Sequence, residues 1–202
     1  MCGILGEFVY NNHSLIDRSR FLSLLELSRN RGPDSQGYFT NNKNFQFGFN
    51  RLSILDLSEN GNQPIHSPSG RYTMVFNGEI YNYQDLRTEL ISKGHTFHSQ
   101  SDTEVIIVAY KEWGIECLSR FVGMFAFALW DRKKKELILA RDRFGIKPLY
   151  YSLQNKLFAG SHKTFKFLQN LPLDHTIFYN FHNFFQSIFL LFLIYFYQDQ
   201  RI

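Results

Sequence analysis

Cysteine is scarce in this chain, and its scarcity excludes one class of fold. Only Cys2 and Cys117 occur among 202 residues, so a disulfide-stabilised secreted scaffold is excluded. The first fifteen residues also lack the basic start and the apolar run of a signal peptide. Both observations favour a reducing, cytoplasmic location.

An excess of charge of one sign is lacking as well. Lys and Arg number 22 against 18 for Asp and Glu, a formal net charge of +4, and the basic residues are spread along the chain. We expect no nucleic-acid partner, because such binding needs a concentrated basic surface. The apolar run at residues 187–197 is about eleven residues long, short of the ~20 that span a bilayer, which disfavours a membrane partner.

Glycine is absent from the end of the chain. All 13 glycines lie at or before Gly160, whereas nine of the 22 phenylalanines lie beyond residue 163. Composition therefore divides the chain into a domain at residues 1–161 and an unassigned Phe-rich tail at residues 162–202. We interpret the tail as a frameshift or truncation product, since its residue bias fits AT-rich codons. A partner-binding extension is the alternative.

Before the tail, short apolar runs alternate with amphipathic segments and turn residues. Strands are predicted at residues 3–10, 36–40, 45–49, 51–56, 72–77, 124–130, 137–141, 149–152 and 156–159. Helices are predicted at residues 14–29, 82–93, 102–113 and 116–122. Residues 59–69 are predicted to be a loop, and Asn77-Gly78 a tight turn that ends its strand. Because the strands come in hairpin pairs, the sequence predicts an α+β fold with antiparallel sheets.

Cys2 is a candidate nucleophile because of its position. If Met1 is removed, the thiol and a free α-amino group belong to one residue. The α-amino group titrates near pH 8 and can take the proton of the thiol, which is the principle of N-terminal nucleophiles. A chance cysteine followed by an ordinary strand is the alternative that this residue alone leaves open.

Four polar or glycine-containing segments lie at the ends of apolar runs, where sites tend to be built. Each has a structural explanation when taken singly: a helix stop, a surface ion pair, a tight turn and a helix N-cap. The segments are Arg31-Gly32-Pro33-Asp34, residues 50–56, residues 77–82 and residues 101–104.

Together with Cys2, these segments resemble the glutamine-hydrolysing domain of class II glutamine amidotransferases, and most closely the N-terminal half of asparagine synthetases. The resemblance runs from Met1 to about Ser161 and includes residues 123–131 and 140–151. Pro33, residues 51–54 and residues 145–150 favour the asparagine-synthetase group over the phosphosugar and purine amidotransferases. The resemblance implies an Ntn-hydrolase fold, a four-layer α/β/β/α sandwich of antiparallel sheets.

The resemblance also implies a role for each matching residue. Cys2 matches the nucleophile, which attacks the side-chain amide of glutamine and releases ammonia through a thioester. Asn77 and Gly78 match the two donors that stabilise the oxyanion, and Arg31 matches a supporting segment beside the pocket. The residues matched to the glutamine pocket are Arg51 for the α-carboxylate, Asp102 for the α-ammonium, Glu79, and Leu52, Ser53, Ile54 and Leu55.

Cofactors and partners follow from the same resemblance. The glutaminase reaction needs no cofactor and no metal, whereas a synthetase domain, absent from this chain, would require ATP and Mg²⁺. The implied partners are a synthetase domain on another polypeptide and, in a homo-oligomer, a second copy. Two alternatives stay open. In the first, the chain is an inactive truncated fragment or a glutamine-binding module. In the second, it belongs to a relative that aminates a non-aspartate acceptor such as a surface-sugar precursor.

Overall fold

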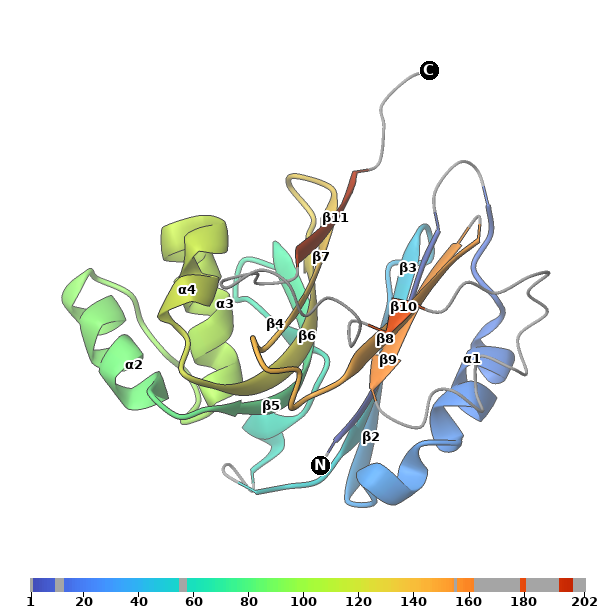
Figure 1. Ribbon diagram of the computed structural model, residues 1–202, viewed down its shortest axis with the longest axis horizontal. Helices are drawn as coiled ribbons and strands as arrows, with labels where there is room; N and C mark the ends of the chain where they lie inside the picture. The colour runs from blue at the N-terminus through green and yellow to red at the C-terminus, as the bar shows by residue number, and fades with distance from the viewer. Residues whose placement is uncertain are drawn as a thin grey trace.

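A computed structural model describes residues 2–9, 13–54, 58–154, 156–161, 179–180 and 193–197. Two antiparallel sheets face each other, and helices cover the outer side of each (Figure 1). Helix α1 lies on one side of the molecule, and α2, α3 and α4 lie on the other. The predicted four-layer α/β/β/α sandwich is therefore confirmed.

The sheets contain six and five strands. The first has the order β10-β8-β9-β1-β3-β2 and the second the order β11-β7-β6-β5-β4, and all pairings are antiparallel. The first sheet consists of β1 (Gly3–Val9), β2 (Ser35–Thr40), β3 (Phe45–Arg51), β8 (Leu149–Gln154), β9 (Lys156–Ser161) and β10 (Tyr179–Asn180). The second consists of β4 (Ile65–His66), β5 (Tyr72–Ile80), β6 (Gly123–Asp131), β7 (Glu136–Arg141) and β11 (Leu193–Tyr197).

The helices are short. They are α1 (Arg18–Glu26), α2 (Tyr83–Ser92), α3 (Asp102–Trp113) and α4 (Cys117–Arg120), with 3₁₀ turns η1 (Arg29–Arg31), η2 (Glu59–Gly61) and η3 (Gly114–Glu116). Among the described residues, no helix has both the length and the apolar composition needed to cross a membrane.

An aromatic core fills the space between the two sheets. The apolar side chains of this core include Phe8, Phe45, Phe47 and Phe49 from the first sheet and Trp130 from the second. Two further cores lie between the sheets and their outer helices. Each sheet is thus covered on both faces, which explains why β1 and β3 are buried throughout instead of alternating between buried and exposed residues.

Helix α1 is shorter than predicted. It begins at Arg18 and not at residue 14, because an Asp17 carboxylate oxygen accepts a hydrogen bond from the Arg20 N–H at 3.0 Å and caps the first turn. The predicted helix at residues 116–122 consists of η3 followed by α4. By contrast, α3 has the predicted bounds, and the Ser101 hydroxyl caps it through the Thr103 N–H at 3.1 Å.

The predicted turn at Asn77-Gly78 is wrong. Strand β5 continues to Ile80, and Gly78 pairs with Phe125 of β6. A Cβ at Gly78 would lie 2.2 Å from the Met124 carbonyl oxygen. The glycine therefore permits close approach of two backbones within a sheet instead of a reversal of the chain.

Two other local predictions also fail. The predicted strand at residues 51–56 is wrong, because β3 ends at Arg51 and residues 52–54 form a loop, while residues 55–56 lie outside the described residues. The predicted loop at residues 59–69 contains η2 and β4. Most of the tail, residues 162–178, 181–192 and 198–202, lies outside the described residues; β10 pairs with β8, and β11 pairs with β7.

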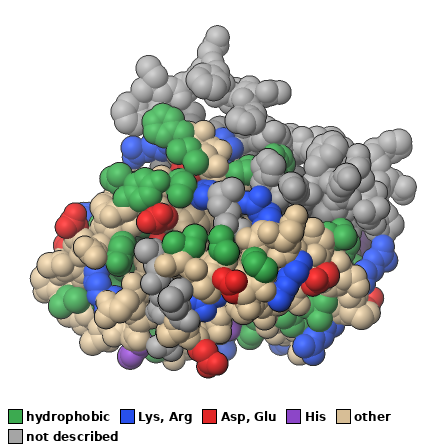
Figure 2. All heavy atoms as spheres, turned by 90° about the horizontal axis from the view of Figure 1, so that it is seen from below, with side chains coloured by type: hydrophobic (Ala, Val, Ile, Leu, Met, Phe, Trp, Pro, Cys, Tyr) green, Lys and Arg blue, Asp and Glu red, His purple; other side chains and the backbone are tan. Residues whose placement is uncertain are grey.

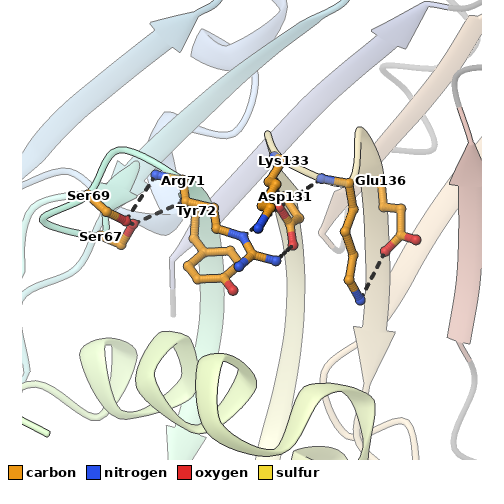
Figure 3. A network of polar contacts seen from close by, with 8 residues as sticks. Ser67, Ser69, Arg71, Tyr72, Asp131, Lys133 and Glu136 are labelled. Atoms are coloured by element: carbon orange, nitrogen blue, oxygen red, sulfur yellow. Dashed lines mark hydrogen bonds and ion pairs between the residues drawn. The ribbon is translucent and has the colours of Figure 1, made fainter.

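An ion pair joins Arg71, which immediately precedes β5, to the last residue of β6, at the end opposite to Gly78 (Figure 3). The Arg71 guanidinium donates to both carboxylate oxygens of Asp131, at 3.0 and 2.7 Å. The same carboxylate accepts from the backbone N–H groups of Lys133 and Lys134 at 2.9 and 3.1 Å. Although burial raises the pKa of Asp131, these bonds outweigh it and hold the pKa below its usual value.

Candidate active site

Cys2 lies immediately before β1, on the wall of a cavity of about 120 Å³ between the two sheets. The Leu52 N–H donates to the Cys2 Sγ at 3.4 Å, and the thiol lies 3.6 Å from the Leu52 carbonyl oxygen. Strand β3 supplies Arg51 to the cavity, and β5 supplies Asn77. The site is therefore built from both sheets.

The structure brings most of the predicted site residues together. Those that line the cavity are Cys2, Arg51, Leu52, Ile54, Asn77, Gly78, Glu79 and Asp102. Ser53 is not among the lining residues, and its N–H donates to an Asp34 carboxylate oxygen at 2.7 Å. Leu55 lies outside the described residues.

Asn77 presents a buried donor. The residue is 1% exposed, and among the described residues no group accepts a hydrogen bond from its Nδ2. An unpaired buried amide costs about 1–3 kcal/mol, so its retention beside a thiol indicates a ligand that completes the bond.

Opposing effects act on the pKa of the Cys2 thiol. Burial raises its pKa, and this effect exceeds the lowering by the Leu52 N–H and by the charges of Arg51 and Lys147. Arg31 adds a cation behind the nucleophile, with its Nε donating to the Cys2 carbonyl oxygen at 3.5 Å. Burial lowers the pKa of Arg31, against the opposing effect of Cys2.

Arg51 is buried and fixed in place. One of its terminal nitrogens donates to the Ser58 carbonyl oxygen at 2.8 Å and to the Asn62 side-chain oxygen at 2.9 Å. Gln63, which follows, ties this segment to β5 through two hydrogen bonds with the backbone of Phe76. The guanidinium is therefore oriented before any ligand arrives.

Asp102 lies at the first turn of α3, on the acidic side of the cavity. Its carboxylate accepts from the Ile80 N–H at 2.9 Å. Burial raises the pKa of Asp102, and the neighbouring Glu79 raises it further, against the lowering by the hydrogen bonds. A cation placed here would lower the pKa of Asp102 and favour its charged form.

Sequence reasoning missed Lys147, which also lines the cavity. Lys147 follows the glycine-containing turn of residues 143–146 and precedes Pro148. A lysine that is only 3% exposed needs anionic or polar neighbours. A signal existed in the sequence, since this lysine stands inside an otherwise apolar run.

A larger cavity of about 450 Å³ lies beside α3 and the β4–β5 turn. Its lining includes His66, His95 and Lys111 but none of the predicted site residues. We assign the smaller cavity as the candidate active site, because it contains the thiol and the unpaired amide. Among the described residues, His, Cys, Asp and Glu form no group of three that could hold a metal ion.

Comparison with known families agrees with this geometry. The family model described as "Glutamine amidotransferase domain" matches residues 1–187. The chain belongs to the glutamine amidotransferase domain family. This amidotransferase domain is 45% identical over 176 residues to asparagine synthetase [glutamine-hydrolyzing] 1 of Bacillus subtilis, covering 84% of this chain and 27% of the relative. It is 41% identical to amidase chry2 of Gibberella zeae, covering 80% of this chain and 26% of that protein.

Solved structures agree on the fold. The glutamine phosphoribosylpyrophosphate amidotransferase of B. subtilis, complexed with ADP and GMP, has a TM-score of 0.64 at 20% identity, covering 79% of this chain and 41% of that one. A structure of the allosteric regulatory enzyme of purine biosynthesis has a TM-score of 0.67 at 19% identity, covering 89% and 44%. The predicted Ntn-hydrolase fold is thus confirmed. The chain spans about a quarter of the length of the curated relatives that it matches.

Proposed function

We propose that this domain hydrolyses glutamine to glutamate and ammonia, with the Cys2 Sγ as nucleophile. The observation that carries the proposal is the unpaired, buried Asn77 Nδ2 in the same cavity as the thiol. Membership of the glutamine amidotransferase family supports it independently.

The proposed reaction has two stages. The Cys2 thiolate attacks the side-chain carbonyl carbon of glutamine, and the carbonyl oxygen becomes an oxyanion that accepts from the Asn77 Nδ2 and the Gly78 N–H. After removal of Met1, the α-amino group of Cys2 takes the thiol proton and passes it to the leaving nitrogen, so ammonia departs. Water then attacks the thioester carbon, giving glutamate and restoring the thiol.

Charges of opposite sign in the cavity suit the zwitterionic end of glutamine. Arg51, oriented by Ser58 and Asn62, binds the α-carboxylate. Asp102 and Glu79 bind the α-ammonium, and this cation reverses the upward pKa shift of Asp102. Leu52 and Ile54 complete the wall.

The ammonia needs an acceptor, and we propose that a synthetase domain on another polypeptide supplies it. Such a domain would use ATP and Mg²⁺ to activate aspartate, or a different acid in a relative with another acceptor.

Large hydrophobic side chains stand exposed near the cavity end of β5, β6 and β7, at Tyr81, Val122, Phe144 and Ile146. Figure 2, which views the molecule from below Figure 1, shows groups of hydrophobic side chains on that face. A partner domain, or a second copy, would cover such side chains. The scarcity of cysteine supports a cytoplasmic location for this assembly.

The test is glutamine hydrolysis by the purified chain beside Cys2→Ala. We expect glutamate and ammonia to be released in equal amounts by the wild type and not by the variant, with intact mass confirming that Met1 is removed. Equal background rates in both proteins would refute the proposal. In that case, calorimetric binding of glutamine would favour the binding module, and an absence of binding would favour the inactive fragment.

A further inference from the structure

The turn between β7 and β8 is tied to β6 by one carboxylate. The Asp142 side chain accepts from the backbone N–H groups of Phe144 at 3.1 Å, Ile146 at 2.9 Å and Lys147 at 2.9 Å. It also accepts from the Phe125 N–H of β6 at 3.2 Å. The backbone of Lys147 is therefore held in a fixed position relative to the sheet that carries Asn77.

The Lys147 side chain is enclosed with the nucleophile. It is 3% exposed and lines the same cavity of about 120 Å³ as Cys2. Burial lowers the pKa of Lys147, as does the neighbouring Arg31, whereas the charges of Cys2, Asp142 and Glu79 raise it. Because an ammonium in such a place needs anions, a thiolate at Cys2 and the ammonium stabilise each other.

The other charged groups around the thiol make different contacts. Arg51 is bonded to the loop and faces the proposed α-carboxylate of the substrate, which neutralises its charge once glutamine is bound. Arg31 contacts the Cys2 carbonyl oxygen. The anions Glu79 and Asp102 disfavour a thiolate until the substrate ammonium arrives. Lys147 is a cavity-lining cation whose charge favours the Cys2 thiolate, as do the charges of the N-terminus and Arg51.

We propose that Lys147 is a positioning residue for the nucleophile: the Asp142 turn holds its ammonium in the cavity, where it stabilises the Cys2 thiolate. The assignment rests on the proposed role of Cys2. It adds a residue outside the predicted set and links a turn remote in sequence to the reactivity of the N-terminal thiol.

The rate of alkylation by iodoacetamide, measured against pH, tests this directly. Cys117 gives no background reaction below its pKa, because it is 1% exposed and burial raises its pKa to about 12. The rate therefore reports the thiolate fraction of Cys2. Intact mass must show the same N-terminus in every protein. In Lys147→Met we expect the pH midpoint to rise by about one unit, and the rate at pH 7 to fall about tenfold.

Two matched variants separate charge from packing. Lys147→Arg retains the cation and should keep the wild-type midpoint. Lys133→Met removes an exposed cation from the β6–β7 turn and should also leave it unchanged. An unchanged midpoint in Lys147→Met, or an equal rise in either control, overturns the assignment. Since alkylation requires no turnover, a failure to hydrolyse glutamine leaves this test intact.

A second measurement compares two proteins that both retain Lys147. The coupling is reciprocal, so removal of the thiolate must lower the pKa of Lys147. We expect the ¹³Cε resonance of Lys147, in protein labelled with ¹³C-lysine, to titrate at lower pH in Cys2→Ser than in the wild type. The resonance is assigned by its absence in Lys147→Arg. Identical titrations in the two proteins overturn the proposal.

Discussion

The backbone N–H of Leu52 lies 3.4 Å from the Cys2 Sγ and donates to it. This contact joins Cys2, the residue before β1, to the loop that follows Arg51. The nucleophile and the proposed carboxylate-binding residue are therefore positioned by the same short segment. A disturbance of this segment should alter substrate binding and thiol reactivity together.

Replacement of Asn77 should reduce catalysis without unfolding the protein. Asn77→Ala removes the proposed oxyanion donor, and we expect kcat for glutamine hydrolysis to fall about 10²–10³-fold with little change in KM. Thermal stability should stay the same or rise, because the variant removes an unpaired buried amide. Steady-state kinetics and thermal unfolding check both points. A loss of stability with unchanged kcat would show that Asn77 is only structural.

Replacement of Arg51 should act mainly on binding. Arg51→Lys keeps the charge but loses the planar group that Ser58 and Asn62 orient. We expect KM for glutamine to rise about 10–100-fold, the equivalent of about 1.4–2.8 kcal/mol, with a smaller change in kcat. Glutamine with a methyl-esterified α-carboxyl group is the control substrate. If the variant discriminated between glutamine and the ester as strongly as the wild type does, Arg51 would not bind the carboxylate.

Gly78 should tolerate no side chain. The new Cβ of Gly78→Ala would lie 2.2 Å from the Met124 carbonyl oxygen, so β5 and β6 must move apart. We expect a loss of about 1–3 kcal/mol in the free energy of unfolding by urea. Gly114→Ala is the control, since nothing lies near its added Cβ and only its positive φ of 59° opposes the change. Equal losses in the two variants would refute the crowding argument.

The Arg71–Asp131 pair should make stability depend on pH at acid values. Because the pKa of Asp131 is lowered in the folded protein, its contribution is present above the unfolded pKa of about 3.9 and is lost as pH falls through the folded pKa. We expect Arg71→Met to lose about 1–3 kcal/mol at pH 7, and the difference from wild type to shrink below about pH 4. Urea unfolding at several pH values measures this, with the exposed Arg132→Met as control. A difference independent of pH would assign the effect to packing.

The sequence was sufficient for features that depend on local chemistry. Helix α3 has its predicted bounds, because Ser101 caps one end and Gly114, with a positive φ, closes the other. Asn77-Gly78 was misread as a turn because the same pair serves in hairpin turns and in crowded strands. Only the pairing of β5 with β6 distinguishes the two, and that pairing is not a local property.

The candidate site was predictable to the extent that it follows ordered motifs. Those motifs located Cys2, Arg51 and Asp102, and the fold brings them into one cavity. Lys147 was missed because its significance arises from the carboxylate of Asp142, which folds the turn toward β6. Its place inside an apolar run marks this lysine as unusual, but the sequence pattern does not reveal that a tertiary contact brings it into the cavity.

Because the site is divided between two sheets, the rate of catalysis should depend on how these sheets are aligned. Cys2 and Arg51 belong to one layer, Asn77 and Gly78 belong to the other, and the aromatic core between the layers helps to hold them in register. A small slip of one sheet over the other would preserve every strand pairing and yet separate nucleophile from oxyanion donor. When packing in that core is weakened, activity should therefore be lost before secondary structure is lost. The rate of glutamine hydrolysis then reports the packing between the layers.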